Sequence, residues 1–334
     1  MNSSLVSYNG TGASDSGFYI IAFQTLQNKN YLILALSFIF FITLMGNLVL
    51  LAFVYLNPSL HNPKYVAVCN LAVVDISISS VIIPQMVPVF VLNLNYVSFE
   101  LCFSQMFFLH FFADMESFSL AVLAYDRLVA ICLPLRYPVI NTIQRMCLIL
   151  AGVWFLVFLL EIYPVSLASR LSYCASRVIR SCCCEHGPVY ILACGDTSYN
   201  KRLATAKTMV VLLCPLTFII ITYLIVIITV LKIASVEQCW KAFNTCFTHL
   251  LLVLTYYLPV ILAYLLGNVR LMLTPDLLTA ILTVTATLPP MLNPIIYSLK
   301  TEELRVIIMK VLGWKKIIYI KIKMSVMAKQ IYKK

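Results

Sequence analysis

Charged residues are scarce in this sequence. Asp, Glu, Lys and Arg make up 11% of the 334 residues, whereas 62% are hydrophobic and the mean hydropathy is +0.94. Soluble domains contain about 25% charged and about 45–50% apolar residues. This scarcity excludes an ordinary soluble protein, because one core could not hide so much apolar surface from water. The composition favours a single helical bundle whose outer surface faces lipid.

Acidic residues are the scarcer of the two charges. The chain has 13 Asp and Glu against 24 Lys and Arg, which gives a formal net charge of +11. In a soluble protein such an excess would suggest nucleic acid as a partner. Ten of the basic residues, however, lie from Lys300 onward, after the last apolar stretch. A basic tail beside a membrane span indicates attraction to anionic lipid, so membrane lipid is the expected partner and nucleic acid is not.

The sequence has no internal repeat, no low-complexity block and no long polar segment that could form a soluble domain. Seven stretches are long and apolar enough to cross a bilayer, which takes about 20 residues. We therefore predict an all-α membrane protein, a seven-transmembrane helix bundle over residues 31–299, with an N-terminal tail at 1–30 and a basic tail at 300–334 that begins as an amphipathic surface helix. The spans are expected at about 31–56, 65–92, 102–128, 146–168, 203–231, 242–266 and 272–299.

Residues 1–28 lack Lys and Arg and contain no apolar run before a cleavage site, so no signal peptide is expected and the first span should act as a signal anchor. Sixteen basic residues fall on the side of the C-terminal tail and eight on the other side. The positive-inside rule therefore predicts a multi-pass plasma-membrane protein with an extracellular N-terminus and a cytoplasmic C-terminus. Asn2 and Asn9 stand in glycosylation sequons on the predicted outer side.

Polar residues inside the spans are candidates for function, because each costs free energy in hydrocarbon unless it has a partner. Asn47, Asp75, Glu116 and Asn293 fall at similar depths of four spans, which indicates one connected polar cluster; polar contacts that merely hold helices together are the alternative. Asp75 and Glu116 could not both stay ionised without a cation or a shared proton. We expect a sodium or proton site there, no other cofactor and no catalytic residue, since no metal-spaced His set or nucleophile–base pair is present.

Five strings along the chain carry a family resemblance. Residues 123–138, LAYDRLVAICLPLRYP, resemble the signature of odorant receptors among the rhodopsin-like (class A) G-protein-coupled receptors. Gly46-Asn47, residues 63–75, residues 241–250 (KAFNTCFTHL) and residues 290–298 (PMLNPIIYS) resemble other motifs of that family, in the same order. The chain departs from the pattern at Leu128, where the family has Tyr, and at Asn244, where it has Ser. The mixture resembles fish-type odorant receptors, and the effect of Leu128 on coupling stays open.

The resemblance implies a receptor that binds a small-molecule odorant in the outer half of the bundle and activates a stimulatory, olfactory-type G protein, which raises cAMP. A rhodopsin-like receptor for a peptide or an amine is the nearer alternative, which residues 123–132 and 241–250 disfavour. A transporter or channel is a remote one, since matched repeats and rings of like charge are missing from the sequence.

The resemblance also implies which residues act. Span six would swing outward about Pro259, triggered near Tyr257, while Arg127 leaves Asp126 to meet the G protein, and Tyr223, Asn293, Pro294 and Tyr297 complete the switch. Cys102–Cys184 and Cys174–Cys194 would be the disulfides, with Cys182 and Cys183 as rivals of Cys184. The expected ligand-binding residues are His110, Ala113, Asp114, Ser117, Lys207, Thr208, Val211, Tyr257, Val260, Ile261, Tyr264, Thr279 and Thr283.

Lys207 and Asp114 are the most informative of these residues. If both side chains face the pocket, the ligand should carry polar or charged groups, such as those of an acidic amphiphile, because a pure hydrocarbon would leave both of them unpaired. The alternative is that Lys207 extends outward to the lipid headgroups.

Overall fold

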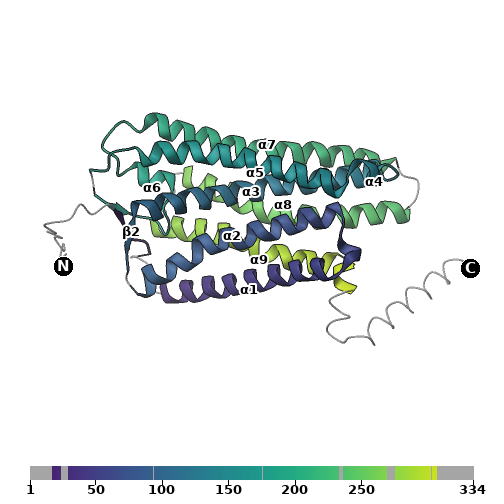
Figure 1. Cartoon of the computed structure of the whole chain (residues 1–334), viewed down its shortest axis with the longest axis horizontal. Helices are drawn as coiled ribbons and strands as arrows, with labels where there is room; N and C mark the ends of the chain where they lie inside the picture. Colours follow the sequence, from purple (N-terminus) through teal and green to yellow (C-terminus); the bar gives the residue numbers. More distant parts are fainter. Residues whose placement is uncertain are drawn as a thin grey trace, which may run out of the picture.

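The computed structural model describes residues 17–23, 29–92, 94–174, 176–232, 236–268, 275–301 and 303–306. In this part of the chain seven long helices run side by side along the long axis of the molecule (Figure 1). They are α1 (Lys29–Leu56), α2 (Pro63–Val91), α3 (Phe99–Cys132), α5 (Ile143–Ser169), α7 (Ser198–Leu231), α8 (Val236–Asn268) and α9 (Pro275–Lys300). Short helices η1 (Pro58–Leu60), α4 (Tyr137–Ile140) and α6 (His186–Tyr190) lie in the connections.

The helices bear apolar side chains on their outer faces, as a lipid environment requires. In α1 only 22% of the most apolar stretch is buried, and Phe38 and Phe41 are each 62% exposed. In α3 the buried share is 67%, so α3 is the central helix of the bundle. Six helices are long and apolar enough to cross a membrane, and α8 adds a shorter apolar stretch at Cys246–Leu262. The all-α membrane fold predicted from composition is therefore observed.

Several helices are longer than the apolar stretches that predicted them. α3, for example, has 34 residues and begins where the Ser98 hydroxyl accepts a hydrogen bond from the Leu101 N–H, an N-cap. Asn62 and Thr142 cap α2 and α5 in the same way. Hydropathy marks only the part of a helix inside hydrocarbon, whereas capping side chains set where the helix begins.

A small sheet closes one end of the bundle, hereafter the sheet end; the opposite end, which holds Arg127, is the Arg127 end. β1 (Gly17–Ile20) lies between β2 (Tyr96–Ser98), to which it is antiparallel, and β3 (Val178–Ile179), to which it is parallel. Phe18 and Ile20 are completely buried. From the sequence, residues 17–20 were expected to be part of a tail, because a four-residue strand buried by distant residues has no hydrophobic periodicity of its own.

Two close contacts fix the path of this N-terminal segment. A Cβ on Gly17 would lie 2.5 Å from the carbonyl oxygen of Val97, so only glycine allows the two strands to approach so closely. Phe23 adopts a left-handed conformation with φ of 57°, and its N–H donates to Asp276 Oδ1 at 2.8 Å. The segment is thereby attached to the start of α9.

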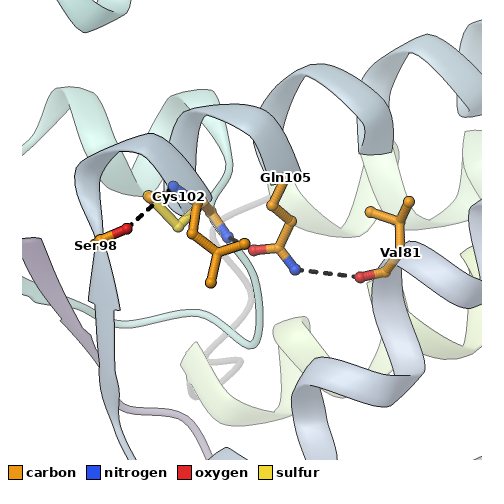
Figure 2. Close-up of a disulfide and its surroundings, with 6 residues drawn as sticks. Val81, Ser98, Cys102 and Gln105 are labelled. Carbon is orange, nitrogen blue, oxygen red and sulfur yellow. Dashed lines mark hydrogen bonds between the residues drawn. A yellow bond between two sulfur atoms is a disulfide. The ribbon is translucent and has the colours of Figure 1, made fainter.

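Two disulfides hold the connection between α5 and α7 at the sheet end. They join Cys102 to Cys184 and Cys174 to Cys194, the pairs that the family resemblance implied. Gln105, one turn after Cys102, accepts from the Cys184 N–H at 3.0 Å and donates to the Val81 carbonyl at 3.3 Å (Figure 2). This glutamine ties the connection to both α3 and α2.

Candidate ligand site and signalling switch

A buried ion cluster lies in the half of the bundle nearer the sheet end. Lys207 of α7 donates to Asp114 of α3 at 3.1 Å and also contacts Glu161 of α5. The three residues are 7%, 7% and 0% exposed. Lys207 therefore does not extend to the headgroups, and its ammonium is paired inside the protein. We call Asp114, Glu161 and Lys207 the ion triad.

Glu161 is not among the residues predicted from the sequence, although its position marks it as unusual. Glu161 is the one charged residue of the apolar stretch at 146–168. A lone carboxylate inside a membrane span needs a partner, and the cations available at comparable depth are few. Pairing it with Lys207 by charge alone would have been possible, whereas the addition of Asp114 to the same cation required the helix packing.

Two histidines lie beside the ion triad. The rings of His110 in α3 and His186 in α6 stack with centroids 4.7 Å apart, and the Tyr190 hydroxyl lies 3.1 Å from His186 Nδ1. Burial, and secondarily the positive charge of Lys207, lowers the pKa of His186 to about 3, so its imidazole is neutral at pH 7. Among the described residues neither His110 Nε2 nor His186 Nε2 has a hydrogen-bond partner.

A second polar contact joins three helices one turn further along α3. The Ser117 hydroxyl lies 2.8 Å from the Tyr257 hydroxyl of α8 and donates to the carbonyl of Val211 in α7 at 2.9 Å. Tyr256 donates to the Ala113 carbonyl at 3.1 Å. The side chains predicted to bind ligand thus include a set that connects α3, α7 and α8 directly.

The other predicted ligand residues do not form one connected set of side chains. Thr208 and Thr283 donate to backbone carbonyls of their own helices, Thr279 is buried, and Thr283 Oγ1 lies 3.2 Å from Cys182 Sγ. Val260 is half-buried, and the side chain of Tyr264 lies outside the described residues. Neither Cys182 nor Cys183 takes part in a disulfide.

Ile261 is a correction to the predicted pocket. It is 42% exposed and shares its face of α8 with the exposed Leu254, Leu258 and Leu262. These positions repeat every three or four residues, which is the spacing of one helix face. Ile261 therefore points outward from the bundle, because packing of α8 against its neighbours turns this face away from the interior.

A cavity of about 630 Å³ lies at the sheet end, and it contains none of the predicted ligand residues. Three of its eight lining residues are aromatic, and the Arg177 guanidinium carbon lies 5.8 Å from the centre of the Phe99 ring. It is lined by Phe99, Glu100, Phe103, Ser104, Ser169, Leu171, Tyr173 and Arg177.

Midway along the bundle, the polar residues singled out in the sequence meet. Asn293 of α9 donates to both carboxylate oxygens of Asp75 in α2, each at 3.1 Å, and also faces Glu116 of α3. Asn47 of α1 donates to the Pro290 carbonyl at 3.1 Å. The four residues are at most 3% exposed. They form one cluster across four helices, hereafter the midplane cluster.

Gly46 explains how α1 reaches this cluster. A Cβ at Gly46 would lie 3.0 Å from Cγ and 3.3 Å from Cβ of Pro294, so the glycine permits close contact between α1 and α9. The neighbouring Asn47 can then bind the α9 backbone. The motifs Gly46-Asn47 and residues 290–298, far apart in the sequence, are therefore two sides of one contact.

The midplane cluster contains oxygen atoms suited to a hard cation. Asn47 Oδ1 and Glu116 Oε1 are buried and have no hydrogen-bond partner in the described part of the chain, and the same holds for Ser79 Oγ, one turn after Asp75 in α2. Oxygen ligands are those that hard cations prefer. No group of three or more His, Cys, Asp or Glu with metal-binding geometry occurs among the described residues.

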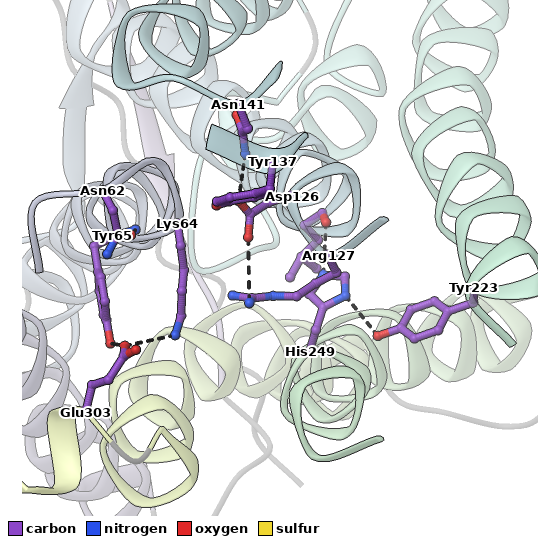
Figure 3. A network of polar contacts seen from close by, with 11 residues as sticks. Asn62, Lys64, Tyr65, Asp126, Arg127, Tyr137, Asn141, Tyr223, His249 and Glu303 are labelled. Atoms are coloured by element: carbon purple, nitrogen blue, oxygen red, sulfur yellow. Dashed lines mark hydrogen bonds and ion pairs between the residues drawn. The ribbon is translucent and has the colours of Figure 1, made fainter. Parts of the chain in front are cut away.

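At the Arg127 end, Asp126 is held by three partners (Figure 3). Tyr137 and Asn141 donate to its Oδ1 at 2.7 and 2.8 Å, and Arg127 Nη1 lies 3.7 Å from its Oδ2. Both Tyr137 and Asn141 come from the connection between α3 and α5, which the sequence did not link to Asp126. The arrangement keeps the Arg127 side chain beside its own helix.

A histidine of α8 completes the contacts at this end. His249 lies 3.0 Å from the Leu120 carbonyl of α3 and 2.9 Å from the Tyr223 hydroxyl of α7, with which its ring stacks (Figure 3). Tyr297 is buried, 4% exposed. The three helices that carry Arg127, Tyr223 and His249 are thus held together here, and Pro259 lies inside α8 about three turns away.

The start of α2 is fastened to the residues that follow α9. Lys64 lies 3.2 Å from Glu303, and the Tyr65 hydroxyl also donates to this carboxylate (Figure 3). Residues 303–306 are helical, which agrees with the start of the predicted surface helix; its remainder, like Asn2 and Asn9, lies outside the described residues.

Comparisons with known proteins agree with these motifs. A family model described as olfactory receptor matches residues 36–315. Human olfactory receptor 2AT4 is 35% identical over 298 residues, covering 89% of this chain and 92% of its own, and human olfactory receptor 52K1 is 35% identical over 299 residues, covering 89% and 95%. The crystal structure of squid rhodopsin superposes with a TM-score of 0.68 at 18% identity, covering 85% of each chain. This chain therefore belongs to the olfactory receptor family, multi-pass membrane receptors that respond to small molecules through G proteins and are not enzymes.

Proposed function

We propose that this olfactory receptor binds a small-molecule odorant near the ion triad and activates a stimulatory, olfactory-type G protein at the Arg127 end, which raises cAMP. The observation that carries the proposal is the course of α8. Its Tyr257 contacts Ser117 on the ligand side, and its His249 contacts Tyr223 at the Arg127 end. A ligand that displaces Tyr257 can therefore move the same helix at both places.

The sheet end would face the outside of the cell. Support comes from the charge distribution, with sixteen Lys and Arg on the opposite side against eight, and from the two disulfides at the sheet end, since disulfides persist in oxidising surroundings. The same topology would expose Asn2 and Asn9 to glycosylation and lay the basic tail at 300–334 on the inner leaflet.

The resting contacts explain how the receptor would be held inactive. Arg127 pairs with Asp126, and His249 links α8 to α3 and α7. Activation would separate α8 from α3 about Pro259, release Arg127 toward the G protein and turn Tyr223 and Tyr297 inward. A ligand can shift this equilibrium only by binding the open arrangement more tightly than the closed one.

The midplane cluster would hold a sodium ion or a proton between Asp75 and Glu116. The unpartnered oxygen atoms of Asn47, Ser79 and Glu116 support this assignment. An ion there would balance the carboxylate charge when α2, α3 and α9 are packed closely. Its release would accompany the movement of α9 at Asn293 and Pro294.

The test is a cAMP reporter assay in cells that carry the olfactory G protein, screened with water-borne odorants. Arg127→Ala should abolish signalling while an epitope at the N-terminus remains detectable on unpermeabilised cells and ligand still binds. Arg136→Ala is the matched control, because Arg136 is an exposed arginine close to the same end. Retained signalling by the Arg127 variant would refute the mechanism, and an epitope accessible only after permeabilisation would refute the orientation.

A further inference from the structure

We propose that the ion triad selects ligands with a cationic nitrogen, that is, aliphatic amines. The proposal rests on the proposed function and names the ligand class of the same site. It differs from the sequence-based expectation of an acidic amphiphile, which treated Lys207 as a free positive charge. The reason for the change is Glu161, which the sequence did not connect to Lys207.

The ion triad contains two acids and one base. The carboxyl groups of Asp114 and Glu161 surround the single ammonium of Lys207, and all three side chains are at least nine-tenths buried. The neighbouring His186 is neutral, because burial lowers its pKa to about 3. Without a ligand, one carboxyl group therefore holds a proton, because an unbalanced buried charge is costly. A ligand ammonium can take the place of that proton and leave both carboxyl groups ionised.

An acidic ligand would meet the opposite situation. The Lys207 ammonium already donates to two carboxylates, which leaves few of its three N–H groups for a third anion. A ligand carboxylate would also bring a third acidic group to the single ammonium, and like charges brought together at an interface weaken binding. The ion triad therefore discriminates against acids through repulsion as well as through missing donors.

Hydrogen-bonding groups suited to an ammonium lie at and beside these two carboxyl groups. Glu161 Oε2 is buried and accepts no hydrogen bond from any described residue. The Nε2 atoms of His110 and His186 are likewise buried and unpartnered within the described ranges. A primary ammonium has three donors, and a carboxylate oxygen and a neutral imidazole nitrogen are acceptors for them. These side chains come from α3, α5 and α6, so an amine would be held between helices.

Binding at this place can reach the signalling switch. Asp114 lies three residues before Ser117, on the same side of α3, and Ser117 contacts Tyr257 of α8. A cation that draws Asp114 and Glu161 together would therefore change the contact between α3 and α8. The alternative is that the proton stays between the two carboxyl groups when an amine is present, which would make the triad a purely structural unit.

The experiment compares hexylamine, hexanoic acid and hexanol in the cAMP assay, at equal amounts of surface receptor. We expect hexylamine to activate and the acid to be inactive. Glu161→Gln and Asp114→Asn, each of which keeps the side-chain shape and removes one ionisable carboxyl group, should raise the half-maximal amine concentration about 10- to 100-fold, the loss expected for a hydrogen bond to a charged group. Asp196→Asn, at an exposed aspartate just before α7, is the matched control and should leave the response unchanged.

The remaining outcomes overturn the proposal. They are a response led by the acid or the alcohol, no response to the amine, or an amine response that survives in both carboxylate variants, as a shared proton would predict. Two single-residue variants are compared, so that the test remains valid if one of them fails to reach the cell surface. G-protein coupling is tested independently of any ligand, by the cAMP signal of the Asp126→Asn receptor without odorant. Failure of the amine assignment can therefore be distinguished from failure of the proposed function.

Discussion

Replacing Asp126 by asparagine should raise the cAMP signal of this receptor in the absence of odorant. The Asp126 and Arg127 side chains are 1% and 12% exposed, and their charged atoms lie 3.7 Å apart. Asparagine retains an oxygen that can accept from Tyr137 and Asn141, so the substitution removes the ion pair while keeping the hydrogen bonds. In the proposed mechanism only the resting state would lose this interaction, because Arg127 would leave Asp126 on activation.

The size of the effect follows from the geometry. Unit charges at this separation attract by about 4 kcal/mol at an effective dielectric of about 20. Side-chain entropy and desolvation reduce the net value to about 1–2 kcal/mol. While the active state is the minor one at rest, its population should rise by a factor of about 5–30.

The assay is ligand-free cAMP accumulation normalised to receptor at the cell surface. Tyr137→Phe removes one hydrogen bond to Asp126 and keeps the ion pair, so its effect should be smaller. Adding Arg127→Ala to the Asp126→Asn variant should abolish the gain. An unchanged or lower basal signal at equal surface amount would show that the ion pair does not hold the resting state.

Two further predictions concern stability. Gly46→Val should lower the melting temperature in detergent, with overpacking against Pro294 costing about 1–3 kcal/mol, and Gly46→Ala should do so less; equal melting temperatures would contradict the close contact. Burial lowers the pKa of His186 from 6.5 to about 3 and raises that of Glu185 from 4.5 to about 7. His186 therefore makes the folded receptor less stable as the pH falls below about 6.5, because only the unfolded chain then gains a proton at this residue. Glu185 has the opposite effect as the pH falls below about 7, because its buried carboxyl group becomes neutral. When the pH is lowered from 7 to 5, the melting temperature of the Glu185→Gln receptor should fall and that of the His186→Gln receptor should rise; identical pH profiles of the two variants would refute both assignments.

The family motifs could be located from sequence because each is a local string of fixed order. Gly46-Asn47, Asp75, residues 123–138 and residues 290–298 are legible one segment at a time. Their depth in the spans also predicted that the polar members would lie close together; Asn293 contacts Asp75 and Glu116, and Asn47 reaches the same helix at the Pro290 carbonyl. Depth is predictable because a helix rises by a constant amount per residue.

The partners of ionic groups were less accessible. Lys207 has two partners on two other helices, and which face each helix turns inward depends on packing among all of them. Ile261 lies on the outer surface for the same reason. Tyr137 and Asn141 bind Asp126 from a connection that has no hydrophobic period, and Glu303 binds Lys64 and Tyr65 from beyond the last span, so nothing in the local sequence selects these partners.

Sequence alone thus determined that the helices lie in lipid, how many long helices there are and to which family this protein belongs, because hydropathy, span length and short motifs are properties of single segments. Only the tertiary structure decided which charges face one another. Burial of β1 by β2 and β3, and the pairing of Lys207 with Asp114 and Glu161, join residues tens of positions apart. Such contacts depend on the rotation and height of whole helices, and these are fixed by the packing of the entire bundle.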